Sequence, residues 1–141
     1  MSITATATLE GALHATNAWL KELAEELGWT DRHRAYRALR AVLHALRDRL
    51  TIAEVADLGA QLPMLIRGLY YEGWDPNRIE TALRTREAFL AEVAGAFPGD
   101  DDAYAVGIAL GVFTVLERHV SAGEVEDVKH VLPAGVRALM P

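Results

Sequence analysis

Several residue types are scarce or missing in this sequence, and each absence excludes a class of protein. The chain has no cysteine, which excludes disulfides, thiolate zinc sites and a cysteine nucleophile, and which fits a reducing compartment. Serine occurs only at Ser2 and Ser121. Because Ser121 is expected to cap a helix, a serine nucleophile is not expected. No segment shows the period-two alternation of a strand, and no glycine-rich phosphate loop is present.

Long apolar runs and targeting signals are also missing. The longest uncharged run covers residues 103–116, which is shorter than the roughly 20 residues that cross a bilayer. The first residues contain neither the basic charge nor the apolar stretch of a signal peptide. We therefore expect a cytoplasmic protein that makes no membrane contact.

The composition that remains is that of an ordinary globular domain. Hydrophobic residues make up 51% of the 141 residues and charged residues 24%, which is enough to bury a core without staples. The net charge of −6 lies entirely in the second half, because residues 1–70 balance eight acids with eight Lys/Arg whereas residues 71–141 carry twelve against six. An acidic balance argues against nucleic-acid binding by the whole chain, but it leaves open a local basic surface on the first half.

The chain matches itself without a gap when it is shifted by seventy positions. Between residues 11–70 and 81–140, 17 of the 60 aligned pairs are identical. The most telling matches are Thr51-x-x-Glu54 with Ser121-x-x-Glu124, and Leu62-Pro63 with Leu132-Pro133. An internal repeat of this kind predicts a duplicated structural unit. We expect one domain over residues 1–141, with a first repeat over about 5–73 and a second over about 75–141.

Each repeat is predicted to contain four helices, so the fold class is all-α with about eight helices around one shared core. The first helix runs from about Leu9 to Leu27 and carries an apolar stripe of Leu9, Leu13, Leu20, Leu23 and Leu27. The second begins near Asp31 as N-cap. The third follows the capping box at Thr51, in which hydroxyl and carboxylate serve each other's backbone amides. The fourth begins at Pro63, where a proline is tolerated.

The second repeat is expected to differ from the first in its own second helix. The segment 102–120 is apolar on all sides, which predicts burial nearly all round. Gly107 and Gly111 lie one turn apart in it and would let another helix approach closely. The repeat is predicted to begin at Asp75 as N-cap, with Pro76 in the first turn.

A resemblance to a known family appears in the segments Arg37–Leu50, Ala60–Pro63 and Tyr70–Trp74, together with the repeated Leu-Pro-x-x-x-Arg pattern. These segments resemble the bacterial domain of unknown function 2267 family over essentially the whole chain. The resemblance implies a compact helical bacterial protein. It implies no activity.

A stripe of basic residues is the sharpest candidate for a functional surface. Its members fall within an arc of about 80° on the second helix, opposite the apolar face, and are expected to be exposed. They are His33, Arg37, Arg40, His44 and Arg47. Arginine suits phosphate and carboxylate groups through its planar fork. The alternatives are a solvated polar face, pairing with the acids of the first helix or of the acidic second half, an anion or nucleic-acid site, and a partner surface.

The arginine repeated in the fourth helix of each copy is predicted to be structural. Arg67 and Arg137 are expected to form ion pairs with the acids of the third helix. These acids are Glu54 and Asp57 in the first copy, and Glu124 and Asp127 in the second. The aromatic segment Tyr70–Trp74 is expected to seal the join between the two halves.

No constellation of residues indicates catalysis, a metal or a cofactor. The histidine pairs His44 with Asp48 and His130 with Glu126 lack the third ligand that zinc sites require. We therefore expect a non-enzymatic helical interaction module that binds a protein partner or a second copy of itself. The alternative is an anion or nucleic-acid binder that uses the basic stripe.

Overall fold

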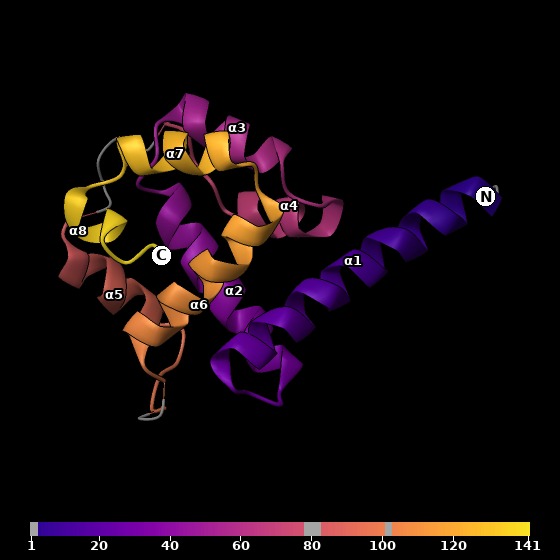
Figure 1. Ribbon diagram of the computed structural model, residues 1–141, viewed down its shortest axis with the longest axis horizontal. Helices are drawn as coiled ribbons and strands as arrows, with labels where there is room; N and C mark the ends of the chain where they lie inside the picture. The colour runs from indigo at the N-terminus through magenta and orange to yellow at the C-terminus, as the bar shows by residue number, and fades with distance from the viewer. Residues whose placement is uncertain (1–2, 78–82, 101–102) are drawn as a thin grey trace.

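The computed structural model describes residues 3–77, 83–100 and 103–141, and within these ranges it contains eight helices and no strand (Figure 1). The predicted all-α class is therefore confirmed. None of these helices is both long and apolar enough to cross a membrane. The helices are α1 (Ile3–Leu27), α2 (Arg32–Arg47), α3 (Ile52–Ala60), α4 (Met64–Tyr71), α5 (Arg86–Ala94), α6 (Ala105–His119), α7 (Ala122–Val131) and α8 (Ala134–Arg137).

The helices α2 and α6 form the centre of the fold. They contact each other, and both also contact α1 and α5, while α4 packs on α1 and α2. At one end of this pair α3 lies beside α7 (Figure 1). One cluster of buried apolar residues draws on both halves of the chain, with Leu39, Val42, Leu43 and Leu46 from α2 and Ile108, Val112, Phe113 and Leu116 from α6.

The apolar helix α6 is buried on most of its surface, as its sequence indicated, with one correction. Leu110 is exposed, so burial is not complete all round. Gly111 admits α1, because a Cβ added there would lie 2.6 Å from Cδ2 of Leu27. Gly107 has no such role, since its nearest side chain is that of Tyr104. Only one of the two glycines therefore serves a close helix approach.

The hydroxyl caps predicted for the third helix of each copy are present. Thr51 Oγ1 accepts a hydrogen bond from the Glu54 amide and Ser121 Oγ accepts one from the Glu124 amide, each at 3.2 Å. The prediction that the Glu124 carboxylate accepts from the Ser121 amide is wrong, because this amide donates to Gln61 Oε1 at 2.8 Å. The Glu124 carboxylate therefore does not serve the cap.

Helix starts agree with the predicted seventy-residue offset in part of the chain. α7 begins seventy positions after α3, and α8 begins seventy positions after α4, which is consistent with duplication. The predicted start at Pro76 is wrong for the described residues: Asp75 Oδ1 accepts the amide of Asn77 in a turn, and α5 begins at Arg86 with Thr85 as N-cap. Residues 78–82 of that predicted helix lie outside the described ranges.

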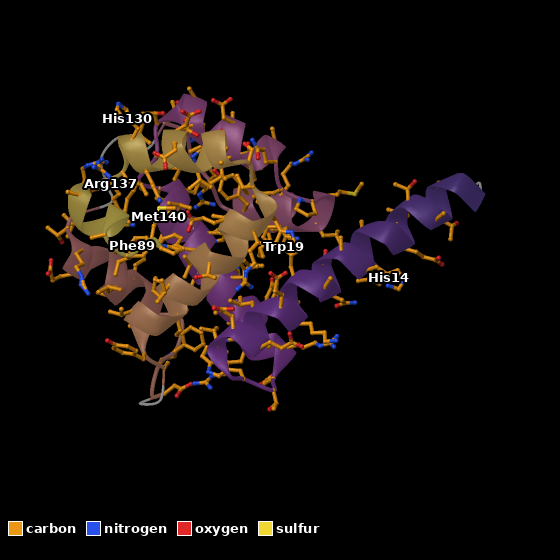
Figure 2. All side chains as sticks on the ribbon, in the orientation of Figure 1. His14, Trp19, Phe89, His130, Arg137 and Met140 are labelled. Carbon is orange, nitrogen blue, oxygen red and sulfur yellow. The ribbon has the colours of Figure 1, made fainter. Side chains whose placement is uncertain are left out.

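Helix α1 is longer than the sequence suggested, and its first half is not part of the body. It begins at Ile3, and its N-terminal half points away from every other helix (Figure 1). Leu9 and Leu13, predicted for the apolar stripe that packs on the core, are 49% and 55% exposed. We refer to residues 3–18 as the arm, because Trp19 is the first buried residue of α1 and lies where the helix reaches the body (Figure 2).

Candidate functional site

The basic stripe on α2 faces the ends of neighbouring helices, so the prediction that it is exposed is largely wrong. Arg47 is only 4% exposed, Arg37 and His44 are half-buried, and His33 and Arg40 are exposed. The side chain of Asp31 caps α2 by accepting from the amides of His33 and Arg34, and this defines where the helix begins.

Arg47 lies at the centre of the stripe's contacts. Its Nη1 donates to the carbonyl oxygens of Tyr70 at 2.8 Å and Glu72 at 2.9 Å, and its Nε donates to Asp48 Oδ1 at 2.9 Å. His44 Nε2 lies 2.7 Å from the carbonyl oxygen of Leu69. The last carbonyls of a helix have no partner within the helix and carry partial negative charge. Arg47 and His44 therefore cap the C-terminal end of α4.

Two further arginines of the stripe also have partners within the chain. Arg37 Nη2 donates to the Ala96 carbonyl at 2.6 Å, and its guanidinium lies 4.7 Å from the centre of the Phe97 ring. Arg40 pairs with Glu72 at 2.7 Å, and this hydrogen bond lowers the pKa of the Glu72 carboxyl. The ring of His33 stacks on that of Tyr36 at 5.9 Å. The stripe is thus engaged mainly with the protein itself.

A groove between α2 and α5 brings three stripe residues together. It encloses about 350 Å³ and is lined by Arg37, Arg40, His44 and Glu92, together with Ala41 and Ala96. Burial lowers the pKa of His44, and the nearby charges of Arg47 and Arg40 lower it further, against the opposing effect of the Leu69 carbonyl. His44 is therefore mainly neutral at pH 7, and the positive charge of the groove comes from Arg37 and from Arg40, which is paired with Glu72.

The repeated arginines do not form the predicted ion pairs. Arg67 donates to the carbonyls of Gly59 and Leu62, each at 2.9 Å, and Arg137 donates to the Leu132 carbonyl at 3.0 Å. Among the described residues, no acid lies within ion-pair distance of either arginine. Each arginine instead binds carbonyls at the C-terminal end of the preceding helix, which is the same device that Arg47 uses.

Two of the four acids predicted for those ion pairs, Glu54 and Glu124, are buried where α3 meets α7. They are 8% and 7% exposed, and Oε1 of each has no hydrogen-bond partner. Burial raises the pKa of Glu124 to about 8, and its contact with the Glu54 carboxyl and the charges of Asp57 and Asp127 act in the same direction. Asp57 and Asp127 themselves are exposed. The two glutamates thus face each other across the repeats.

Two cations that sequence reasoning passed over join the repeats. Arg49 is buried and donates to the carbonyls of Ala45 and Leu83, with Glu92 at 3.4 Å. Arg34 pairs with Asp100 at 2.8 Å, and its guanidinium lies 4.0 Å from the centre of the Trp29 ring. Apart from the Trp29 ring, five positions before Arg34, their partners are 34 or more positions away or are backbone atoms, so no local pattern identifies the links between the repeats.

The aromatic segment Tyr70–Trp74 packs mainly within its own repeat. The Tyr70 hydroxyl donates to the Val55 carbonyl at 2.9 Å, which joins α4 to α3. The Tyr71 ring covers Gly59, where an added Cβ would lie 2.5 Å from the Tyr71 hydroxyl oxygen, and it contacts Trp74. The segment closes the α3–α4 corner, and nothing in these contacts shows the predicted seal between the halves.

The root of the arm is held firmly on α6. Arg118 pairs with Glu22 at 3.1 Å and Glu26 at 2.9 Å, and His119 lies 2.7 Å from Glu22. The His119 ring also stacks on Trp19 at 4.5 Å. Burial acts to raise the pKa of Glu22, but the hydrogen bonds from His119 and Arg118 together lower it. Glu22 and Glu26 of α1 therefore pair with α6 and not with the stripe.

The arm presents an apolar seam that continues into the core. Spacings of four and three residues alternate along the seam, the pattern of a coiled-coil helix. Its positions are Leu9, Leu13, Thr16, Leu20, Leu23 and Leu27. Leu20 and Leu23 are buried in the body, whereas Leu9 and Leu13 are about half exposed and no other helix packs on them. One helix therefore carries a seam of which only half is occupied.

A second groove lies where the seam meets the body. It encloses about 230 Å³ between α1, α2 and α4. It is lined by Thr16, Leu20, Tyr36, Leu39, Leu65, Ile66, Leu69 and Glu72. Thr16 and Leu20 belong to the seam, and Leu65 is exposed. The uncovered seam and this mainly apolar groove thus form one continuous surface. Among the described residues, no group of three or more His, Asp or Glu side chains is placed to hold a metal ion.

Comparison with known proteins identifies a family. The sequence model of the family described as "Uncharacterized conserved protein (DUF2267)" matches residues 16–139. The search of curated proteins found no match. The family match begins within the arm, so it includes the groove and the core but not Leu9 and Leu13.

Proposed function

Since the chain belongs to the DUF2267 family of uncharacterised conserved proteins, we propose a function from its surface: a non-enzymatic helical interaction module that associates with a second copy of itself. The observation that carries this proposal is the half-occupied seam of α1. Leu9 and Leu13 are about half exposed on a helix whose other seam leucines are buried, as Leu20 and Leu23 are, or partly buried, as Leu27 is. An apolar helical stripe without a cover is characteristic of a protein interface.

The seam favours a helix as the element that covers it. Its alternating spacing of four and three keeps one side of α1 aligned with a neighbouring helix. The arm spans about 24 Å at 1.5 Å per residue and contains Thr6, Thr8 and Gly11, which are weak helix formers. Isolated helices of this length are marginal in water, so a partner would supply the missing stabilisation.

A second copy fits this surface because it provides an arm that can fill the groove of the first copy and a groove that can receive the arm of the first copy. The arm of each copy would lie in the groove at the root of the other arm, and the two contacts would form together around a two-fold axis. Glu10 is the only Asp, Glu, Lys or Arg in the arm, so no charge pattern opposes its pairing with an identical arm. If Leu9 lies against the partner's Thr16 in an antiparallel pair, Leu13 falls next to the axis.

The expected dimer is of moderate strength. Complete burial of a leucine contributes about 1.5–3 kcal/mol, and Leu9, Leu13 and Leu65 of each copy are already about half covered. The six side chains together would then contribute roughly 5–9 kcal/mol, against an association cost of about 4–15 kcal/mol. The remaining contacts of the arm have to supply the difference.

Sedimentation equilibrium over about 5–500 µM tests the proposal. The wild-type chain should convert from monomer to dimer, and the Leu9→Ser/Leu13→Ser variant should remain monomeric with an unchanged core. The variant Ile52→Ser/Leu83→Ser is the matched control, because it removes two exposed apolar side chains outside the arm. A wild-type chain that stays monomeric at the highest concentration would overturn the proposal.

The absence of cysteine allows a second measurement of the same geometry. In an otherwise cysteine-free chain, Leu13→Cys should form an intermolecular disulfide on mild oxidation, because the residue lies next to the proposed axis. Leu83→Cys, which is also exposed, should not cross-link faster than random collision allows. Equal cross-linking of the two variants would contradict the antiparallel arrangement of the arms.

Anion binding in the groove of Arg37, Arg40 and His44 is the second candidate function. The convergence of three stripe residues on one groove favours it, but Ala96, Glu72 and Leu69 already partner these side chains. Phosphate or nucleic-acid binding that weakens steeply with salt and is lost in Arg37→Gln/Arg40→Gln would support it. Arg47 is left unchanged in this test because it is buried.

A further inference from the structure

The contact between the two repeats at α3 and α7 contains two buried carboxyl groups. Glu54 and Glu124 each occupy the third position of their helix, after the capping residues Thr51 and Ser121. The equivalent positions of the two repeats therefore meet, since α3 and α7 pack against each other (Figure 1). More than nine-tenths of each side chain is buried.

The hydrogen bonding of this pair is incomplete without a proton. Oε1 of Glu54 and Oε1 of Glu124 are both buried and have no partner, although the two carboxyl groups lie within hydrogen-bonding contact. An ionised carboxylate is only an acceptor, so two ionised carboxylates cannot bond to each other. One proton placed between them would give one oxygen a donor and the other an acceptor.

The charged groups around the pair do not compensate two negative charges. From α3 the neighbouring acid is Asp57, and from α7 it is Asp127. From α4, Tyr70 lies close to both glutamates, and its hydroxyl donates a hydrogen bond to the Val55 carbonyl. Burial raises the pKa of Tyr70, which the positive charge of Arg47 of α2 acts to lower, but the Arg47 guanidinium itself is hydrogen-bonded to Asp48 and to the end of α4. The remaining polar contact between α3 and α7 is that of Gln61 with Ser121, which is neutral.

We propose that Glu54 and Glu124 share one proton at neutral pH and form a proton-dependent latch that joins α3 of the first repeat to α7 of the second. The bond donated by the protonated carboxyl closes the contact. Loss of the proton leaves two like charges in a site with little access to water, and their repulsion opens the contact between α3 and α7.

The direction of the pH effect follows from the raised pKa of Glu124, which is about 8 in the folded chain and 4.5 for the unperturbed group. The folded state holds the proton more tightly than the unfolded state, so the latch stabilises the fold fully below about pH 4.5 and loses its contribution as the pH rises to about 8. The lowered pKa of His44 acts in the opposite sense only below pH 6.5. A window from pH 7 to pH 9 therefore isolates the latch.

Thermal unfolding of the full chain at pH 7 and pH 9 is the first test. The wild-type melting temperature should fall by several degrees across this window, since a change of 1 kcal/mol shifts it by about 4 °C in a chain of this size. In Glu124→Gln the amide is a permanent donor to Glu54, so the fall should be largely absent. Glu126→Gln is the control, because Glu126 is an exposed acid on the same helix, and it should behave as wild type.

Side-chain carboxyl carbon shifts measured by NMR provide the second test, which does not depend on stability. One glutamate carboxyl of the wild-type chain should titrate above pH 7, and that signal should be absent from Glu124→Gln. Ionisation of every glutamate below pH 6, or equal pH dependence of melting in wild type and Glu124→Gln, would overturn the latch. Amide exchange at pH 9 should be faster in α7 of wild type than in α7 of Glu124→Gln.

Discussion

The helices α2 and α6 stand at equivalent places in the two predicted repeats but hold their neighbours by different means. α2 uses long cationic side chains, and Arg47 and His44 bind the carbonyls that end α4. α6 binds acids of α1 through Arg118 and His119 only at its C-terminal end. Along the rest of its length it uses small and apolar residues, and Gly111 lets the Leu27 side chain of α1 pack directly on the helix backbone. In the first repeat, a basic stripe on α2 therefore binds the ends of neighbouring helices. In the second repeat, the equivalent face of α6 packs on its neighbours mainly through close apolar contact.

The largest expected effect comes from removing the cation that α2 uses at its centre. Arg47→Met should destabilise the chain by about 3 kcal/mol, because the carbonyls of Tyr70 and Glu72 lose a buried donor. Urea unfolding measures the change. A loss below about 1 kcal/mol would show that the end of α4 does not depend on Arg47, and it would remove the contrast between the two helices.

A smaller loss is expected from filling the close contact of α6. Gly111→Ala should cost about 1–3 kcal/mol, because the new Cβ would lie 2.6 Å from Leu27 Cδ2 and the leucine has to move. Gly123→Ala in α7 is the matched control, since nothing lies within 4 Å of its added Cβ. That control should gain about 0.5–1 kcal/mol through helix propensity. Equal effects of the two substitutions in urea unfolding would show that α1 does not need the small residue.

The smallest effect is expected at the outer edge of the stripe. Arg40→Gln removes an ion pair with Glu72 in which both side chains are exposed, and such pairs contribute little to stability. The melting temperature at pH 7 should stay within measurement error of wild type. Because the pKa of Glu72 is lowered by this contact, any difference should begin to shrink below the unperturbed carboxyl pKa of 4.5 and should vanish once the pH lies below the lowered pKa of Glu72. A large loss at pH 7 would mean that exposed stripe residues are structural too.

The sequence predicted the helices better than it predicted the partners of their side chains. The caps at Asp31, Thr51 and Ser121 were identifiable because a hydroxyl or carboxylate and the amide it serves are at most three residues apart. The partners of Arg67 and Arg137 were predicted wrongly because backbone carbonyls compete with acids for a guanidinium, and carbonyls carry no sequence signature. The start of α5 was missed because an Asp-Pro pair also fits a turn.

For the candidate surfaces, too, the sequence predicted the helices but not which distant residues they contact. The leucine stripe of the first helix was visible in the sequence, but its periodicity does not say where along the helix the body ends. The pair of Glu54 and Glu124 could be anticipated only in that the two glutamates occupy equivalent positions of a repeat. Their meeting depends on α3 packing on α7, which a pattern within either segment does not encode.

By itself the sequence determined the all-α class, the apolar stripes and most helix starts, because these depend on spacing and on bonds between near neighbours in the chain. Tertiary structure decided that Arg47 is buried, that the arm leaves the body before Trp19, and that two like-charged glutamates face each other. The physical reason is that burial, pairing and protonation depend on which distant segment lies opposite, and that is fixed only when the helices pack.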